Sequence, residues 1–395
     1  MANLRPLDGI TVIALEHAVA APVCTRHLAD LGARVIKVER PGAGDFARGY
    51  DKRVKGISSY FAWANRSKES LTLDLKHSEA QDILRRLLDK ADVLVQNLAP
   101  GAASRMGLSG AALRPTHPRL VVCDISGYGN NGPYRDKKAY DLMIQAEAGL
   151  LAVTGTTDSM ARAGFSAADV SAGMYAYSSI LAALLLRERT GEGSAIDISM
   201  FETLGEWMGN PMYYTYGGEP PAPRTGPFHP SVVPYGPFPA GDGSSIMMGL
   251  QNEREWVTFC REVLKDAALA EDPRFDSNLH RTENRAALET LIRERFSRMT
   301  GAEVEAALDA ANMATARVNT PADLWQHPQH QARGRWRSVD SPVGPVEALL
   351  PPGVNDHFDY RMDGIPGLGQ HTDAILGELG YDHAGISRLR NENVI

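Results

Sequence analysis

The apolar residues in the first part of the chain come in short runs separated by amphipathic stretches. Runs at 11–15 (TVIAL), 33–39 (ARVIKVE) and 91–97 (ADVLVQN) are rich in β-branched or aliphatic residues, as in buried strands. The stretch that ends at Gly32 and the stretch 78–90 instead have the spacing of helices. Strands that alternate with helices are typical of a parallel α/β sheet, and this is the fold class that we predict.

Further strands are predicted at 71–75, 118–127 and 195–200, with a glycine-rich segment that turns helical near Asp141. A long apolar helical run lies between Gly164 and Gly193, and Asp169 stands just ahead of it. A carboxylate at a helix start is held ionised and oriented by the backbone N–H groups there. Aspartate is also an ordinary N-cap residue, so position alone favours a capping role for Asp169.

A proline-rich passage at 219–243 separates this α/β pattern from a block of different composition. The block contains a strand-like run at 245–251 and helical stretches at 253–264 and 286–297. A hairpin-like segment follows at 336–353. We therefore predict a domain boundary in the proline-rich passage.

Composition and charge narrow the class of protein. The chain has 395 residues, of which 43% are hydrophobic and 23% charged, and its net charge is -7 with no basic arm, which disfavours nucleic acid as a partner. The N-terminal segment lacks the pattern of a secretory signal, no later run reaches transmembrane length, and the three cysteines are far apart. We expect a cytoplasmic protein without membrane or nucleic-acid partners.

Several kinds of site are disfavoured by missing motifs. The first predicted strand is not followed by GxGxxG, and neither a Walker A loop nor a GxSxG elbow is present. His327 and His330 are split by a proline and lack carboxylates in zincin order, so no metal is expected. What remains is a carboxylate with basic loops around it, which form either a solvated face or a site for an anionic ligand: Arg40, Arg48, Arg66, Lys68 and Lys76.

The chain resembles the class III CoA-transferase family, also called CaiB/BaiF or formyl-CoA transferase family, over almost its whole length. The resemblance is carried in order by LDGITVIALEHAVAAP, KVERPGAGDFAR, NRSKESLTLDLK, NLAPGAASRMGL, SGYGNNGPY, YDLMIQAEAG, RTGEGSAIDISM, DPRF and LGQHTDAILGELG. It implies a Rossmann-like large domain built from both chain ends, a smaller central α+β domain, and an interlocked homodimer. The corresponding boundaries are 1–215 and 330–395 for the large domain and 225–325 for the small one.

The resemblance also implies the chemistry. Asp169, in AADVSAG, matches the family nucleophile, which attacks the thioester of an acyl-CoA and forms an aspartyl anhydride. Coenzyme A thioesters are then substrates, and no cofactor is bound permanently. The matching motifs give the residues expected to bind CoA: His17, Ala18, Val19, Arg40, Leu73, Lys76, Asn97, Leu98, Arg105 and Lys138.

Two departures within the superfamily bear on the activity. α-Methylacyl-CoA racemases have a histidine where this chain has Tyr140, and tyrosine is a poor acid/base partner at neutral pH, so racemisation is the alternative rather than the first hypothesis. A non-catalytic CoA-binding protein is a further alternative. The glycine-rich loop of the formate and oxalate transferases is missing and Val19 replaces their glutamine, which disfavours formyl or oxalyl specificity.

The motifs look most similar to members that act on mesaconate, itaconate or citramalate, with succinyl-CoA as donor. Tyr60, Tyr140 and Arg48 are the expected lining of the acyl slot. A dicarboxylate also needs a cation for its distal carboxylate, and the sequence leaves four candidates open: Arg48, Arg66, Arg224 and His229.

Overall fold

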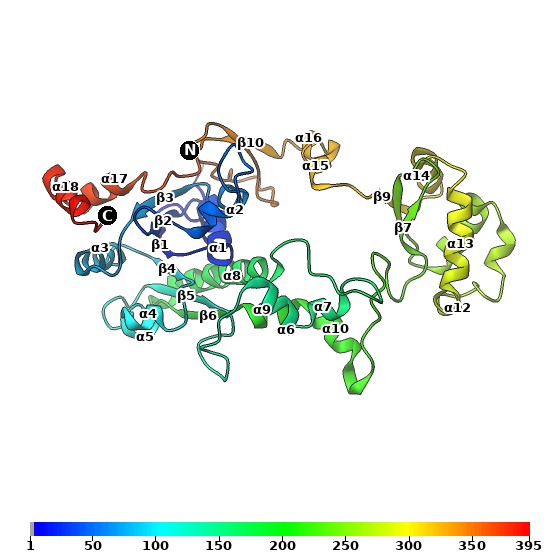
Figure 1. The fold of residues 1–395 in the computed structure, drawn as a ribbon, viewed down its shortest axis with the longest axis horizontal. Coiled ribbons are helices and arrows are strands. Elements are labelled where there is room, and N and C mark those ends of the chain that lie inside the picture. Colours follow the sequence, from blue (N-terminus) through cyan, green and yellow to red (C-terminus); the bar gives the residue numbers. More distant parts are fainter. Residues whose placement is uncertain (1–3) are drawn as a thin grey trace. The chain divides into compact units, whose positions relative to one another are not determined.

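The computed structural model describes residues 4–395, and the chain forms two compact units (Figure 1). The first unit contains the chain up to Gly149, Ala163–Asn210 and Arg333–Ile395, and the second contains Leu150–Arg162 and Pro211–Ala332. The predicted boundaries, 1–215, 225–325 and 330–395, differ from these units mainly at 150–162. That segment joins the central unit because Arg224 donates hydrogen bonds to the carbonyls of Ala152, Thr156 and Thr157.

The first unit is built on a parallel sheet of six strands in the order β3-β2-β1-β4-β5-β6, the order of doubly wound Rossmann sheets. The strands are β1 (Thr11–Leu15), β2 (Arg34–Glu39), β3 (Lys68–Thr72), β4 (Val93–Gln96), β5 (Val121–Ser126) and β6 (Ala195–Ser199). The predicted parallel α/β fold is therefore confirmed. The third strand begins three residues earlier than predicted. Its first residues have polar side chains, which the apolar pattern does not detect, and ion pairs make these side chains compatible with burial.

The helices and the hairpin of the first unit follow the predicted alternation. They are α1 (Ala20–Asp30), η1 (Phe46–Gly49), α2 (Ser59–Ala64), α3 (Ser78–Leu88), α4 (Ala102–Arg105), α5 (Gly110–Leu113), α6 (Asp141–Glu147), α8 (Ala167–Thr190), α9 (Met200–Trp207), β10 (Trp336–Val339), β11 (Val346–Leu349), α17 (Thr372–Glu378) and α18 (His383–Asn391). Another helix, α10 (Gly209–Tyr214), spans the boundary with the second unit. β10 and β11 pair antiparallel, which confirms the predicted hairpin.

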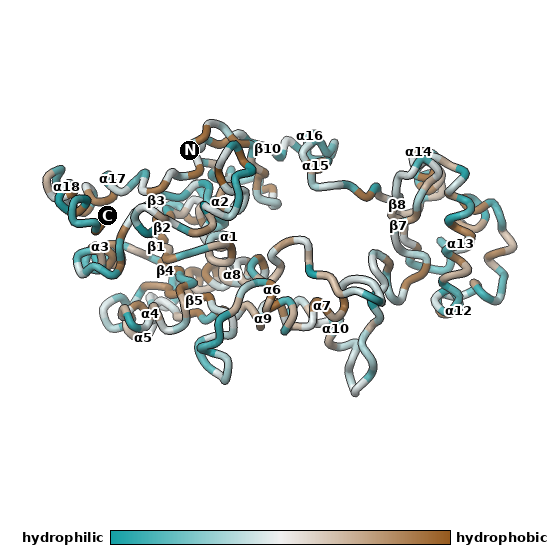
Figure 2. Tube along the Cα trace, viewed as in Figure 1, coloured by the Kyte–Doolittle hydropathy of each residue, from teal (hydrophilic) through white to brown (hydrophobic). Residues whose placement is uncertain are grey.

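Alternate residues of each strand point to opposite faces of the sheet, and both faces are covered. Ile13 and Leu15 of β1 belong to a core that also contains buried residues of α3, α4, α5, α17 and α18. α1 and α8 pack against each other and against the sheet, and the strands appear brown in Figure 2 where their residues are apolar. Because all six strands are parallel, their carboxyl ends share one edge, where a doubly wound sheet binds its ligands.

The last part of the chain returns to cover the outer edge of β3. The backbone N–H groups of Ser67 and His371 donate to the carbonyls of Gly364 and Ser70 (2.9 and 3.0 Å). Thr372 Oγ1 accepts a hydrogen bond from the N–H of Thr72 (3.0 Å). The C-terminal segment thus satisfies backbone groups that an edge strand would otherwise leave open.

α8 is the longest helix of the first unit. With 24 residues and a window of mean hydropathy 1.3, it is long and apolar enough to cross a membrane by length and composition alone. The expectation that no segment reaches that length is therefore wrong. One face of α8, with Ala172, Ala176 and Ile180, is buried inside the unit, as is usual for the core helix of a globular domain.

α1 and α8 meet through backbone at Gly173. A Cβ at this position would lie 2.6 Å from the carbonyl oxygen of Ala20 and 3.1 Å from Cβ of Val23. We expect Gly173→Ala to force the two helices apart and to lower the free energy of unfolding by about 1–3 kcal/mol. Chemical denaturation measures this change.

Gly205, inside α9, is the matched control for that substitution. A Cβ there has nothing within 4 Å, so Gly205→Ala is expected to stabilise the protein by about 0.5–1 kcal/mol through helix propensity. Equal effects of the two alanines would contradict the close approach of α1 and α8.

The second unit has its own core around a three-stranded antiparallel sheet in the order β7-β8-β9. Trp256, Phe259 and Phe275 are fully buried in this core. Its elements are α7 (Leu150–Val153), η2 (Tyr216–Gly218), β7 (Tyr235–Pro239), β8 (Ser245–Gly249), α11 (Glu253–Thr258), η3 (Phe259–Leu264), η4 (Ala267–Ala270), α12 (Asn278–Glu283), α13 (Arg285–Phe296), α14 (Gly301–Ala310), β9 (Ala314–Arg317), α15 (Pro321–Leu324) and α16 (Pro328–Ala332).

Candidate active site

The loops that follow β1 and β4 are joined where the strand order reverses. Asn97 Oδ1 accepts a hydrogen bond from the backbone N–H of His17 (2.8 Å), and Asn97 Nδ2 donates to the carbonyl of His17 (2.9 Å). β1 and β4 are neighbours whose connections run in opposite directions along the sheet. Two residues predicted to bind CoA therefore meet at the topological switch point, the usual ligand site of such sheets.

The turn after His17 has an unusual backbone that leads into α1. Ala18 has φ 60, a left-handed conformation that is uncommon for a residue with a side chain, and Asp45 Oδ1 accepts a hydrogen bond from its N–H (3.1 Å). Val19 is the N-cap residue of α1, and no side chain caps this helix start in the described part of the chain. The turn presents the positive end of α1, which favours negative charge.

A buried cluster of charges supports this turn from below. Lys37 Nζ lies 2.8 Å from Asp45 Oδ2 and 3.2 Å from Glu16 Oε1, and Lys68 Nζ lies 2.7 Å from the same Glu16 oxygen. Thr25 donates to the other Glu16 oxygen (2.6 Å). Burial raises the pKa of Glu16, but Lys37 and Lys68 outweigh it and hold that pKa at about 2. The cluster is thus a structural anchor, and Lys68 belongs to neither a solvated face nor a phosphate site.

Arg66 is buried and Arg48 is half-buried, and both form ion pairs with buried carboxylates, which bears on their predicted role as cations for the substrate. Arg48 Nε and Nη2 donate to the Glu39 carboxylate (2.8 and 2.7 Å), and its guanidinium lies 3.7 Å from the ring centre of Phe61. Arg66 makes two hydrogen bonds to Asp30 (3.0 and 2.7 Å). Their donors serve buried carboxylates, so neither arginine remains as the cation for a distal carboxylate.

Arg224 and His229, the other two candidates for that cation, both belong to the second unit. The Arg224 guanidinium donates hydrogen bonds to the carbonyls of Ala152, Thr156 and Thr157. His229 Nδ1 accepts hydrogen bonds from the N–H groups of Ser231 and Val232, and its ring stacks on Tyr235. Both side chains have local structural partners.

Aromatic side chains line the space beside the His17 turn. His17 stacks on Phe46 with ring centres 5.1 Å apart, Phe46 contacts Tyr50 at 6.0 Å, and Tyr50 meets Tyr60 edge-on at 5.4 Å. We call Phe46, Tyr50 and Tyr60 the aromatic wall, and all three are more than a third exposed. Burial raises the pKa of Tyr50 to about 12, with further contributions from the charges of Asp45 and Asp169. Tyr50 of the wall is therefore within electrostatic range of Asp169.

Asp169 is the third residue of α8, and it does not cap the helix. Oδ1 of Asp141 instead accepts hydrogen bonds from the backbone N–H groups of Ala168 (2.8 Å) and Asp169 (3.2 Å). The Asp169 side chain is half-buried, and burial followed by the charge of Asp141 raises its pKa to about 7. The expectation that Asp169 serves as the N-cap is thus wrong, because a carboxylate from α6 takes that role.

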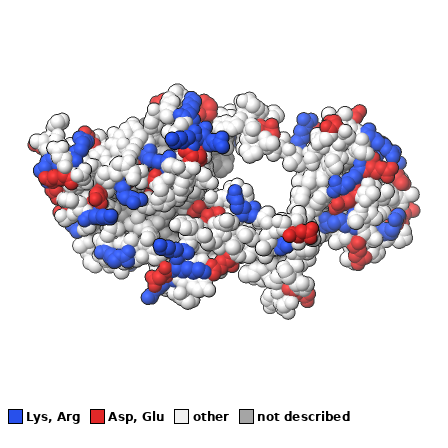
Figure 3. All heavy atoms as spheres, viewed as in Figure 1, with Lys and Arg blue, Asp and Glu red and all other residues white. Residues whose placement is uncertain are grey.

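The remaining predicted CoA-binding residues fall into two groups. Leu73 is 1% exposed and belongs to the core of the first unit. Leu98 lines a cavity of about 370 Å³ at the carboxyl ends of β4 and β5, together with Gln96, Gly101 and Asp124. The basic residues Arg40, Lys76, Arg105 and Lys138 are exposed. Figure 3 shows that basic and acidic side chains are interspersed on one face of the protein.

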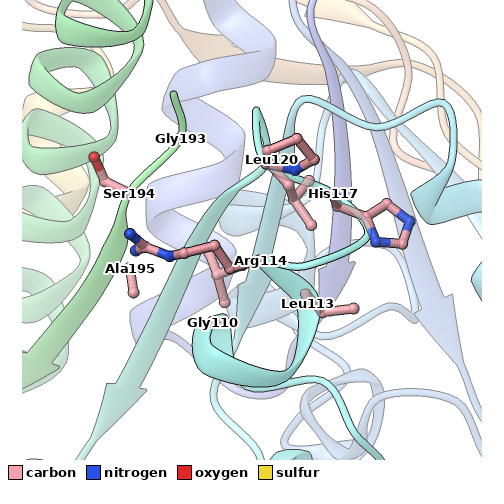
Figure 4. A pocket seen from close by; sticks show the side chains of 10 residues that line it. Gly110, Leu113, Arg114, His117, Leu120, Gly193, Ser194 and Ala195 are labelled. Atoms are coloured by element: carbon pink, nitrogen blue, oxygen red, sulfur yellow. The ribbon is translucent and has the colours of Figure 1, made fainter. Parts of the chain in front are cut away.

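A second, much smaller cavity of about 10 Å³ lies at the opposite, amino-terminal edge of the sheet (Figure 4). Its lining residues come from α5, the turn before β5 and the start of β6, and include Arg114, His117 and Ser194. It has room for about one water molecule. It is therefore a packing defect and not a candidate site.

Four residues of the site were missed by sequence reasoning: Asp45, Phe46, Tyr50 and Asp141. Phe46 and Asp45 stand within KVERPGAGDFAR, and Asp141 begins YDLMIQAEAG, so the motifs contained a signal. What the sequence did not show is that Asp45 and Phe46 contact the His17 turn, that Tyr50 packs on Phe46, and that Asp141 contacts the start of α8. Among residues 4–395, no group of three or more His, Cys, Asp or Glu side chains could hold a metal.

Comparison with known proteins agrees with this architecture. The family model for CoA-transferase family III matches residues 7–372. The human succinyl-CoA:glutarate CoA-transferase is 31% identical over 100% of this chain and 91% of its own length. The succinyl-CoA–D-citramalate CoA-transferase of Chloroflexus aurantiacus is 33% identical over 99% and 98%.

Solved structures give the same assignment. A CaiB/BaiF family protein from Brucella suis superposes with a TM-score of 0.85 and 34% identity, covering 95% of this chain and 99% of its own. The family model, the relatives and this structure agree on nearly the full length. The chain belongs to CoA-transferase family III, the CaiB/BaiF family, and is an enzyme of that class.

Proposed function

We propose that this CoA-transferase moves CoA from succinyl-CoA to a small dicarboxylate, with Asp169 as the nucleophile. One observation carries the role of Asp169. Its carboxylate stands at the carboxyl edge of the sheet, half-buried and within electrostatic range of Tyr50, while Asp141 occupies the N–H groups of the helix start. An oriented carboxylate that is not engaged in capping is suited to covalent catalysis.

In the proposed reaction, an Asp169 oxygen bonds to the thioester carbon, the C–S bond breaks, and CoA leaves as the thiolate. The thiolate then attacks the Asp169 carbonyl of the anhydride, which releases the donor acid and leaves an aspartyl-CoA thioester. The acceptor carboxylate displaces CoA from this thioester and forms a second anhydride. Attack of the thiolate on the acceptor carbonyl yields the new acyl-CoA and regenerates Asp169.

The CoA chain is proposed to lie along the loops at the carboxyl edge. The His17 turn and the start of α1 offer backbone N–H groups and a positive helix end. Exposed cations near the same loops are suited to the phosphates: Arg40, Lys76, Arg105 and Lys138. The cavity beside Leu98 is large enough for part of a cofactor-sized ligand.

The acceptor is proposed to be a dicarboxylate of four or five carbons. Relatives named for glutarate and D-citramalate, with succinyl-CoA as the partner, support this class. Tyr60 and Tyr140 are exposed aromatic residues on the side of Asp169, and Tyr50 adds a third hydroxyl. Itaconate, mesaconate and citramalate remain the first acids to test.

An acceptor panel tests the proposal. The protein is incubated with succinyl-CoA and single free acids, and new thioesters are identified by mass spectrometry. Formation of glutaryl-, mesaconyl-, itaconyl- or citramalyl-CoA is expected. Exchange with none of the acids would overturn the proposal, and deuterium uptake at the α-carbon of a 2-methylacyl-CoA without an acceptor would favour racemisation.

The first unit also supports a proposed homodimer, interlocked as the family resemblance implies. Large apolar side chains of α6, α8 and α9 are more than a third exposed: Leu142, Met143, Leu185, Leu186, Phe201 and Trp207. Apolar surface of this kind commonly marks a protein interface. Light scattering coupled to size exclusion is expected to give twice the chain mass of 42.9 kDa, and a monomer at micromolar concentration would contradict the dimer.

A further inference from the structure

The first turn of α8 is satisfied without any help from Asp169. The backbone N–H of Ala167 donates to the carbonyl of Phe165 (2.9 Å), and those of Ala168 and Asp169 donate to Asp141 Oδ1 (2.8 and 3.2 Å). These are the donors that a carboxylate at the helix start would normally bind. Asp141 belongs to another helix, α6, and its carboxylate lies at the N-terminal end of α8.

Asp141 is itself fixed by a buried amide. Gln145, one turn later in α6, donates from Nε2 to Asp141 Oδ2 (2.6 Å) and to the carbonyl of Phe165 (3.4 Å). Its Oε1 accepts a hydrogen bond from the N–H of Ala163 (3.0 Å), and its side chain is fully buried. Gln145 thereby connects α6 to the segment 163–165 that leads into α8.

We propose that Asp141, held by Gln145, is a positioning residue that caps α8 in place of Asp169 and leaves both Asp169 oxygens to the acyl group. This inference rests on the proposed function of Asp169 as nucleophile. It assigns a task in the transfer reaction to two residues of α6 that do not contact the reacting atoms.

The charge of Asp141 has a second effect. Burial is the main cause that raises the pKa of Asp169 to about 7, and the neighbouring Asp141 carboxylate raises it further. Tyr50 interacts electrostatically with Asp169 as well, but burial raises its pKa to about 12, so it carries no charge at neutral pH. A more basic carboxylate is a stronger nucleophile once it is deprotonated.

The test compares the wild-type enzyme with Asp141→Asn by the pH dependence of kcat/KM for CoA transfer. The wild-type activity is expected to fall below about pH 7, because Asp169 must be deprotonated to attack. In Asp141→Asn, the acidic limb is expected to move down by about one pH unit, since a like charge has been removed. The rate on the plateau is expected to drop roughly tenfold, because a less basic and less firmly oriented carboxylate remains.

Asp382→Asn is the matched control. Asp382 caps α18 by accepting a hydrogen bond from the N–H of Gly385 (2.7 Å), so this variant also removes a capping charge, but far along the chain. Its pH profile is expected to match that of the wild type. A folded Asp141→Asn variant whose acidic limb does not move would overturn the proposal, whether its rate is unchanged or uniformly lower.

A second variant covers the case in which Asp141→Asn does not fold. Gln145→Leu keeps both carboxylates but removes the amide that fixes Asp141, and it is expected to lower kcat with little change in KM for succinyl-CoA. Wild-type kcat in this variant would overturn the role of Gln145.

The pKa of the Asp169 carboxyl can also be measured directly by ¹³C NMR, without turnover. The Asp169 signal is the one that is lost in Asp169→Asn. This measurement therefore tests the influence of Asp141 even if the wild-type enzyme transfers CoA to none of the acids, which would be a failure of the proposed function instead.

Discussion

CoA transfer by the Asp169→Ala variant is expected to fall by roughly a thousandfold or more, because no other group forms the covalent intermediate. Binding of CoA should be retained, since the proposed CoA contacts lie in the loops that follow strands β1 to β5. Steady-state transfer to the best acid of the panel and calorimetric titration with CoA measure the two properties separately. The Asp169 carboxyl does not cap α8 and is partly desolvated, so its removal is expected to leave the fold intact.

Asp356→Ala is the control for this loss, because Asp356 has a side chain that is 90% exposed. It should transfer CoA at the wild-type rate. Hydroxylamine added during turnover should modify the wild-type enzyme at Asp169 and leave Asp169→Ala unmodified. Turnover of Asp169→Ala within tenfold of the wild type would remove this residue from the mechanism.

The Lys37→Met variant is expected to lose about 3–5 kcal/mol of unfolding free energy at pH 8, because two buried carboxylates then lose a cation. Lys37 and Glu16 are completely buried, and Asp45 is 1% exposed. Asp45 also accepts the hydrogen bond from Ala18, so the KM for succinyl-CoA is expected to rise as the His17 turn loosens. Urea denaturation and steady-state kinetics check the two effects.

The pH dependence of stability identifies the cause. In the wild type, the pKa of Glu16 is lowered from 4.5 to about 2, so its contribution is present above pH 4.5 and is lost as the pH falls from there to about 2. In Lys37→Met, the buried carboxylates are expected to take up protons more readily. The difference in unfolding free energy between the variant and the wild type should therefore become smaller towards pH 4. Lys52→Met, at an exposed position, is expected to change little at any pH. A constant difference between pH 4 and pH 8 would contradict an electrostatic cause.

The sheet could be predicted from the sequence where its strands are continuously apolar. β1, β2 and β4 lie at or within the predicted runs, because parallel strands buried on both faces need no polar positions. β3 was placed late because Lys68 and Ser70, although buried, have polar side chains. Polar partners such as Glu16 for Lys68 and Glu39 for Ser70 make those positions compatible with the interior.

The sequence allowed site residues to be proposed where they stand in motifs. It did not reveal the side chains that these residues contact. His17, Asn97 and Asp169 came from motif matches, and the structure brings His17 and Asn97 together. The ion pair of Arg48 was missed because the sequence does not show that Glu39 lies opposite its guanidinium. Asp141 was missed as the cap of α8 because this contact joins residues 27 positions apart, and only the packing of α6 against α8 creates it.

The return of the C-terminal segment to β3 has a consequence for biosynthesis. The first six strands are complete once residue 199 has been made, yet the segment that covers the edge of the sheet begins near residue 363. While the ribosome adds the intervening residues, the emerging chain carries an open strand edge of the kind that pairs with other chains. The last thirty or so residues thus close the large unit, and a chain that terminates prematurely is expected to accumulate in inclusion bodies.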